Sequence, residues 1–161
     1  MKVDICGIKV DNITMIEAVA AIRSKYGTGE RFIVVTPNAE IIEESAKNPE
    51  VAEILNSADM AVPDGVGVIY ASRILKQPIA ERVTGVDLAY NLAEDMSKHG
   101  ASLFILGGEP GVAELAAVNI TKKYPGLKIA GTHDGFYKEE SGVIDIINAS
   151  GADVLYIRPV Y

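Results

Sequence analysis

Residues 101–111 read ASLFILGGEPG, an apolar run followed directly by a glycine-rich turn. The run from Ala101 to Leu106 has no alternation of apolar and polar residues, which is typical of a parallel strand covered on both faces. Gly107 and Gly108 allow a tight turn, and the residues from Pro110 to about Lys123 follow as a helix. Strand, glycine turn and helix in this order predict a β-α unit of a parallel sheet.

The same alternation extends in both directions along the chain. Gly7 interrupts the β-rich stretch 3–10, as in a bent strand or the opening of a hairpin, and Thr14 and Thr84 each precede an acid by three residues, which is a helix-start signal. Further strands are predicted at 31–35 (RFIVV), 59–62, 127–130 and 152–157, with helices between them. The sequence therefore predicts one α/β domain over residues 1–161, with a Rossmann-like, mostly parallel sheet flanked by helices.

The composition of the chain excludes some classes of function. The chain has 161 residues, of which 48% are hydrophobic, enough for a core in one domain. Its single cysteine, Cys6, cannot form an internal disulfide, and the simplest compartment is the cytoplasm. With 15 basic and 22 acidic residues the net charge is −7, and no basic stripe is present, so nucleic acid is not expected as a partner. Self-association into a homo-oligomer is left open.

Polar and glycine-rich segments follow four of the predicted strands. In open parallel sheets, ligands bind in the crevice beyond the carboxyl ends of the strands. These segments together carry hydroxyl, amide, carboxylate and imidazole groups, and they are residues 36–40 (TPNAE), 63–67 (PDGVG), 107–111 (GGEPG) and 131–137 (GTHDGFY). Their convergence predicts a ligand site at one edge of the sheet.

Each candidate residue in the first half of the chain has two interpretations. Asp64 is placed to act as a general base on a sugar hydroxyl, or to cap the helix that follows it. Thr36 and Asn38 are placed to bind a ligand, and both residue types also cap helices well. Arg82 offers a planar fork suited to a diphosphate, or forms a solvated pair with Glu81.

The second half of the chain offers candidates for nucleotide binding. Gly107 and Gly108 let the backbone approach a phosphate at the next helix N-terminus, or they only form a tight turn. Tyr137 is placed to stack on a nucleobase or to pack on the sheet edge. His133 and Asp134 are either a proton-transfer pair or turn residues. The segment lacks the GxGxxG spacing of dinucleotide-binding folds and the chain has no GxxxxGK[ST] motif.

Five segments taken together are similar to a known family. They are TPNAE at 36–40, PDGVG at 63–67, ERVTGVDL at 81–88, LFILGGEPGVAELAA at 103–117 and YPGLKIAGTHDGFY at 124–137. In this order, and over nearly the whole chain, they resemble the WecG/TagA/CpsF glycosyltransferases, most closely those of wall teichoic acid synthesis.

The resemblance implies an inverting transfer of N-acetylmannosamine from UDP-N-acetylmannosamine to N-acetylglucosamine on undecaprenyl diphosphate, giving a β linkage. It implies no metal and no cofactor, and a peripheral position on the inner face of the plasma membrane. By the same resemblance Asp64 is the base, and Thr36, Asn38 and Arg82 line the sugar and diphosphate pocket. A family member with another UDP-sugar donor, or a non-catalytic nucleotide-sugar-binding module, remains the alternative.

The end of the chain departs from the family pattern. After the strand predicted at 152–157, the family continues with a glycine-rich loop, a Pro-Lys-Gln-Glu-like motif and a basic C-terminal segment, whereas this sequence reads RPVY at 158–161. The resemblance implies that this absent segment helps to hold the substrate and provides the contact with the membrane surface. The pocket is therefore expected to be incomplete without it.

Overall fold

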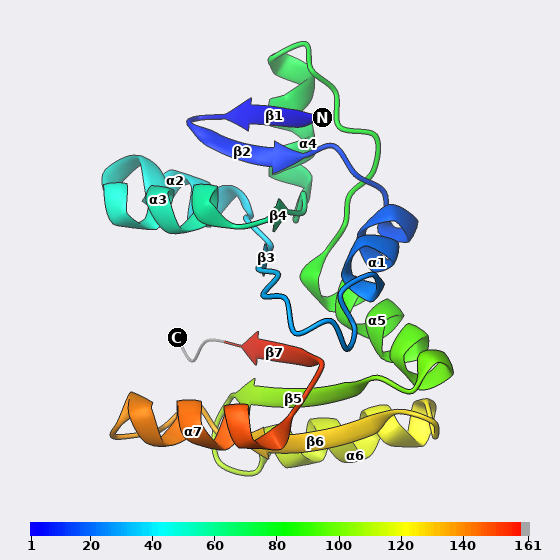
Figure 1. The fold of residues 1–161 in the computed structure, drawn as a ribbon. Helices are drawn as coiled ribbons and strands as arrows, with labels where there is room; N and C mark the ends of the chain where they lie inside the picture. Colours follow the sequence, from blue (N-terminus) through cyan, green and yellow to red (C-terminus); the bar gives the residue numbers. More distant parts are fainter. Residues whose placement is uncertain (159–161) are drawn as a thin grey trace. The chain divides into compact units, whose positions relative to one another are not determined.

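The computed structural model describes residues 1–158, and these divide into two compact units. The first unit comprises Met1–Ser24 and Glu30–Leu88, and the second comprises Lys25–Gly29 and the residues from Ala89 onward. Each unit has its own helices and its own parallel strands (Figure 1). Residues 159–161 lie outside the described residues. They are the last three residues of RPVY, where the sequence is expected to depart from the family pattern.

The first unit combines a hairpin, helices and a short parallel pair of strands. Its elements are β1 (Lys2–Ile5), β2 (Ile8–Asp11), α1 (Met15–Arg23), β3 (Val34–Val35), α2 (Ala39–Lys47), α3 (Pro49–Ser57), β4 (Met60–Ala61) and α4 (Val66–Ile74). β1 and β2 are antiparallel and turn at Cys6 and Gly7, so the predicted hairpin opening is confirmed. The hairpin buries Val3, Ile5, Ile8 and Val10 in one core with α2, α3 and α4.

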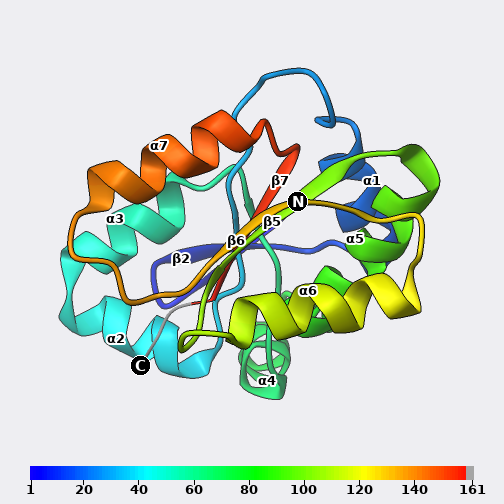
Figure 2. The same ribbon diagram turned by 90° about the horizontal axis from the view of Figure 1, so that it is seen from below.

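The second unit is a three-stranded parallel sheet with helices on both faces. Its elements are α5 (Gly85–His99), whose first residues belong to the first unit, then β5 (Ser102–Gly107), α6 (Val112–Lys123), β6 (Lys128–His133), α7 (Glu140–Ser150) and β7 (Val154–Arg158). The strand order is β6-β5-β7, with β5 in the centre and all pairs parallel. Figures 1 and 2 show α6 and α7 on opposite faces of this sheet.

This arrangement confirms the predicted α/β class and the parallel, Rossmann-like strand pairing. β5, expected from its unbroken apolar run, is buried from Leu103 to Gly107. It is central in its sheet, which explains why its sequence shows no polar face. Both predicted capping signals are also present, because the Thr14 hydroxyl accepts from Glu17 N and the Thr84 hydroxyl accepts from Asp87 N.

The predicted strand RFIVV is shorter and less buried than expected. Only Val34 and Val35 pair as β3, and both are half-buried. Ile33 O accepts from Met60 N at 3.1 Å, but Ile33 N donates to the Asp59 carboxylate at 2.7 Å, so a side chain replaces the strand partner of that N–H. The apolar composition alone did not reveal this side-chain contact.

The strand predicted at 127–130 extends further than expected. β6 continues through Gly131 and Thr132 to His133, which the sequence places in the following loop. Gly131 pairs with Phe104 in register, and a Cβ on Gly131 would lie 2.6 Å from the Phe104 ring. The glycine is therefore required by ring packing inside the sheet, although glycine normally suggests a turn.

Asp153 ties three segments of the second unit together. Its carboxylate accepts from Ser102 N at 2.8 Å, from the Ser102 hydroxyl at 2.9 Å and from Gly27 N at 3.0 Å. Partial burial raises the pKa of Asp153, but the hydrogen bonds from Ser102 and Gly27 lower it by more, so the net pKa lies below its ordinary value.

We expect Asp153→Asn to reduce the free energy of unfolding by about 1 kcal/mol at pH 7, because the amide replaces a charged acceptor. A carboxylate with a lowered folded-state pKa stabilises the fold above its unfolded pKa of about 3.9, and that contribution disappears as the pH falls through the folded-state value. Urea unfolding at pH 7 and pH 3 measures this. A gap between the two proteins that stays constant with pH contradicts the assignment.

None of the helices between residues 1 and 158 is both long enough and apolar enough to cross a membrane.

Candidate functional site

Three extended segments of the first unit lie side by side and end at the same edge. Val62 N donates to Val35 O at 2.9 Å, and Val83 N donates to Pro63 O at 3.0 Å. The residues that follow these segments are Thr36, Asp64 and Thr84. The first unit thus brings two of the predicted site residues to one edge, together with the start of α5, as parallel strand ends require.

Asp64 is held by a backbone contact from α5. Its Oδ2 accepts a hydrogen bond from Gly85 N at 3.1 Å. The alternative in which Asp64 caps the next helix is wrong, because α4 has Gly65 as its N-cap residue and no side-chain cap hydrogen bond. Asp64 instead caps α5 through one oxygen, and its Oδ1 has no hydrogen-bond partner among residues 1–158. The half-buried carboxylate is therefore oriented, with one oxygen available to a ligand.

Gly85 is a site residue that the sequence reasoning missed. A Cβ on Gly85 would lie 3.2 Å from Thr36 Cγ2 and 3.3 Å from Thr36 Oγ1. The absence of a side chain at Gly85 therefore allows the close approach of Thr36, while the Gly85 N–H holds Asp64. The signal was the Thr84–Asp87 cap, which places Gly85 in the first turn of α5, where N–H groups lack helical partners.

Thr36 and Asn38 have different roles in the structure. Asn38 Oδ1 accepts from Ile41 N at 2.9 Å, so the capping interpretation of Asn38 is confirmed, at the start of α2. The Thr36 hydroxyl caps no helix and has no partner among the described residues. It lies beside Gly85, on the edge that carries Asp64.

Arg82 lies two residues before Thr84, in the extended segment that ends at this edge. Its side chain is exposed, and within residues 1–158 it forms no ion pair or hydrogen bond, so the expected pair with Glu81 is not formed. A guanidinium without a protein partner is available to an anionic ligand.

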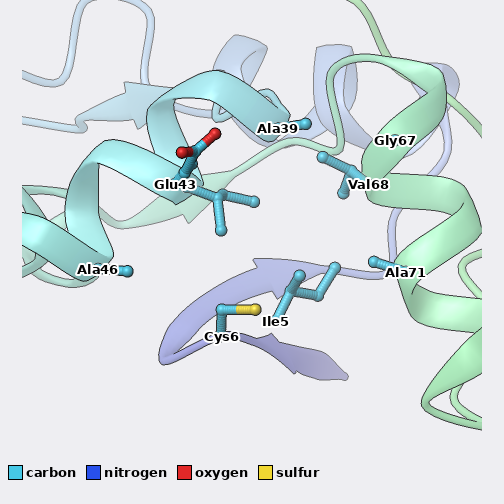
Figure 3. A pocket seen from close by; sticks show the side chains of 9 residues that line it. Ile5, Cys6, Ala39, Glu43, Ala46, Gly67, Val68 and Ala71 are labelled. Carbon is cyan, nitrogen blue, oxygen red and sulfur yellow. The ribbon is translucent and has the colours of Figure 1, made fainter.

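An apolar pocket of about 290 Å³ lies between α2 and α4 (Figure 3). Ala39, Ile42, Glu43 and Ala46 line it from α2, Gly67, Val68 and Ala71 from α4, and Ile5 and Cys6 from the end of β1. A Cβ on Gly67 would lie 2.9 Å from that of Ala39, so glycine is needed where the two helices begin. The Glu43 carboxylate pairs with Lys47 at 2.8 Å, and this hydrogen bond lowers its pKa.

The second unit holds the glycine-rich candidates. Gly107 has φ +125°, and a Cβ there would lie 1.9 Å from Arg158 O on β7. Strand packing alone therefore requires Gly107 to be glycine, which favours its structural interpretation. Gly108 O accepts from Gly135 N at 2.9 Å, so the loops after β5 and β6 are joined. α6 then begins at Val112, after the N-cap residue Gly111, without a side-chain cap, which leaves its N-terminus suited to a phosphate.

Tyr137 lies on the loop after β6, close to His133. The two rings are edge-to-face, with centroids 6.2 Å apart, and Tyr137 is 40% exposed. Asp134 forms a local turn, because its Oδ1 accepts from Phe136 N and its carbonyl contacts His133 Nδ1. The turn interpretation of Asp134 is confirmed, and Tyr137 retains enough exposed surface to contact a ligand.

The candidates thus form two sets, Thr36, Asn38, Asp64 and Arg82 in the first unit, and Gly107, Gly108 and Tyr137 in the second. In the part of the chain from 1 to 158, no three His, Cys, Asp or Glu side chains gather as a metal-binding group.

The chain matches known proteins along most of its length. Residues 3–157 match the model of the glycosyl transferase WecG/TagA/CpsF family. An N-acetylglucosaminyldiphosphoundecaprenol N-acetyl-β-D-mannosaminyltransferase of Bacillus spizizenii is 33% identical over 128 residues, which cover 80% of this chain and 50% of that protein. A protein of the same name from Staphylococcus aureus is 30% identical over 158 residues, covering 97% of this chain and 62% of that protein. The chain spans less than two thirds of the length of these relatives.

Proposed function

Because the chain belongs to the WecG/TagA/CpsF glycosyltransferase family, we propose that it transfers N-acetylmannosamine from UDP-N-acetylmannosamine to N-acetylglucosamine on undecaprenyl diphosphate. The new linkage is β, formed with inversion, in the synthesis of the wall teichoic acid linkage unit. The names of both relatives support the acceptor and the transferred sugar. The enzyme works as a peripheral protein on the inner face of the plasma membrane.

The observation that carries the proposal is the Asp64 carboxylate. Gly85 N–H fixes one oxygen at 3.1 Å, and the other oxygen has no partner among residues 1–158. A general base needs this combination of a fixed orientation and a free acceptor atom. The Thr36 hydroxyl beside it is placed to position a sugar.

The reaction is a single displacement. Asp64 takes the proton from the acceptor 4-hydroxyl, and that oxygen forms a bond to the anomeric carbon of the donor. The bond from the anomeric carbon to the β-phosphate oxygen breaks, and UDP leaves with both electrons of that bond. Attack opposite the leaving group inverts the configuration.

The negative charge that develops on the departing UDP is stabilised by hydrogen-bond donors and positive groups that are already in position before the reaction. Arg82 supplies a guanidinium without a protein partner in the described residues, and the start of α4 at Val66 has no side-chain cap. The nucleotide-binding candidates of the second unit, Gly107, Gly108 and Tyr137, form a set by themselves, with the start of α6 free of a side-chain cap and Tyr137 40% exposed. No metal is assigned a role in this mechanism.

We expect Arg82→Ala to weaken UDP binding about tenfold or more while leaving uridine binding nearly unchanged, because a charge-assisted contact to phosphate is lost. Isothermal titration with both ligands measures the difference. Arg82→Lys keeps the charge without the planar fork and should recover part of the affinity. Equal losses for UDP and uridine would show that Arg82 acts on the fold or the base.

The second candidate function is a nucleotide-sugar-binding module without catalysis. The uncapped start of α6 beside Gly107 and Gly108 favours nucleotide binding by itself. A panel of UDP-sugars, each incubated with a lipid-diphosphate-N-acetylglucosamine analogue, separates the two functions and identifies the donor. If UDP-N-acetylmannosamine is the only UDP-sugar in the panel that releases UDP, the proposed reaction is supported. If another UDP-sugar releases UDP instead, the protein is a different transferase.

A further inference from the structure

One face of α4 is apolar and open to solvent. Val66 is 57% exposed, Tyr70 is 62% exposed and Ile74 is 81% exposed. These residues are four apart, so they lie along the same side of the helix. Three exposed large apolar side chains in one stripe differ from the scattered single residues that are normal on a surface.

The segment that carries this stripe is basic, whereas the whole chain is acidic, and Asp64 and Glu81 flank the segment. The net charge is −7, yet residues 65–80 contain Arg73 and Lys76 and no Asp or Glu. The Arg73 guanidinium lies over the Tyr70 ring, 5.9 Å from its centroid, so positive charge adjoins the apolar stripe. The face formed by Val66, Tyr70, Arg73 and Ile74 is called the α4 face below.

We propose that the α4 face docks on the surface of an anionic lipid bilayer. This inference rests on the proposed function, because the acceptor named for the relatives carries undecaprenol, a lipid. Apolar side chains enter the boundary between headgroups and acyl chains, tyrosine favours that depth, and the basic residues contact anionic headgroups. The surface thus belongs to the described residues and is separate from the C-terminal segment of the family.

Position along the chain supports a lipid as the occupant. α4 begins two residues after Asp64, and its nine residues span about 13 Å. Val66, the first residue of the exposed stripe, is two residues from Asp64, so a helix lying in the interface by this face keeps the backbone of the proposed base within about 8 Å of a residue that contacts lipid.

Charge also favours a lipid over a second copy of the chain. Anionic headgroups complement Arg73 and Lys76, whereas a symmetric contact of this face with itself brings like charges together. The acids elsewhere on the chain oppose docking only weakly where they lie beyond a screening length of about 8–10 Å.

Vesicle co-sedimentation of the 161-residue chain tests the proposal. We expect binding to vesicles of equal parts phosphatidylglycerol and phosphatidylcholine, and weaker binding to phosphatidylcholine alone. Ile74→Glu should lower the partition coefficient about tenfold or more, since it removes an inserted apolar group and adds a negative charge. Arg73→Gln should lower it about fivefold on the anionic vesicles only.

Ile16→Glu is the matched control. Ile16 is 82% exposed and lies on α1 of the same unit, so the substitution makes the same chemical change at the same exposure. We expect its partition to stay within twofold of the parent. Equal losses in Ile16→Glu and Ile74→Glu would overturn the assignment to α4, as would unchanged binding in Ile74→Glu or no preference for anionic vesicles.

Two further measurements assign the remaining outcomes. If light scattering shows that the parent is a dimer and Ile74→Glu a monomer, with no difference in vesicle binding, a second copy occupies the face and the proposal is wrong. UDP titration should give the same affinity for the parent and Ile74→Glu. If neither protein binds UDP, but Ile74→Glu still weakens vesicle binding, the proposed function fails and the docking surface stands.

Discussion

In the chain extended to the length of its relatives, replacing Asp64 by asparagine is expected to lower the turnover number by about 10²–10⁴-fold. The amide keeps the size of the side chain, and its oxygen still accepts the hydrogen bond from Gly85 N that holds the carboxylate at 3.1 Å. The substitution removes only the ability to take the acceptor proton. UDP binding, measured by calorimetry, should remain nearly normal.

Asp87→Asn is the control for this experiment. Asp87 also contacts the start of α5, through Thr84, but it is exposed and has no assigned part in the chemistry. Its turnover should stay within a few fold of the parent. Near-parental turnover in Asp64→Asn would return Asp64 to a purely structural role as a cap of α5, and an equal loss in both variants would indicate disturbance of the helix.

The second large effect is expected on stability, from Gly107→Ala. The new Cβ would lie 1.9 Å from Arg158 O, so β7 must move away from β5. The φ of +125° is also unfavourable for any residue with a side chain. Steric overlap and backbone strain together should reduce the free energy of unfolding by about 3 kcal/mol or more.

Gly111→Ala separates strain from overlap. Gly111 has φ +88°, and nothing lies within 4 Å of the position of its Cβ, so only strain of about 1 kcal/mol is expected. Urea unfolding of the two variants measures the difference. Equal destabilisation would show that the close approach of Arg158 O to Gly107 does not exist in solution.

The sequence predicted the helices and the class of the fold well, because their signals are local. One of the helices expected between strands is α3 (Pro49–Ser57), where Pro49 suits the first helical turn and the Asn48 side chain accepts from Glu50 N. RFIVV was over-predicted because Asp59 binds Ile33 N, a contact between residues 26 positions apart. Gly131 suggested a turn because glycine is common in turns. Its actual role, to accommodate the Phe104 ring, depends on a residue of another strand.

Part of the candidate site was also predictable. Thr36 and Asp64 follow neighbouring extended segments, and parallel segments bring their ends together. Which helix Asp64 caps was not predictable, because Gly85 lies 21 residues further along the chain. Asn38 is a cap of α2, as its residue type suggested. The α4 face was not predicted, since it depends on which side of the helix packs on β1.

The most direct test of the proposed transfer is acceptor-dependent release of UDP. UDP-N-acetylmannosamine is incubated with the chain extended to the length of its relatives, with and without a prenyl-diphosphate-N-acetylglucosamine acceptor. We expect UDP release only when the acceptor is present, in equal amount to a β-linked disaccharide product. UDP-N-acetylmannosamine that binds but is never consumed, whatever the acceptor concentration, would contradict this expectation and would leave a nucleotide-sugar-binding module.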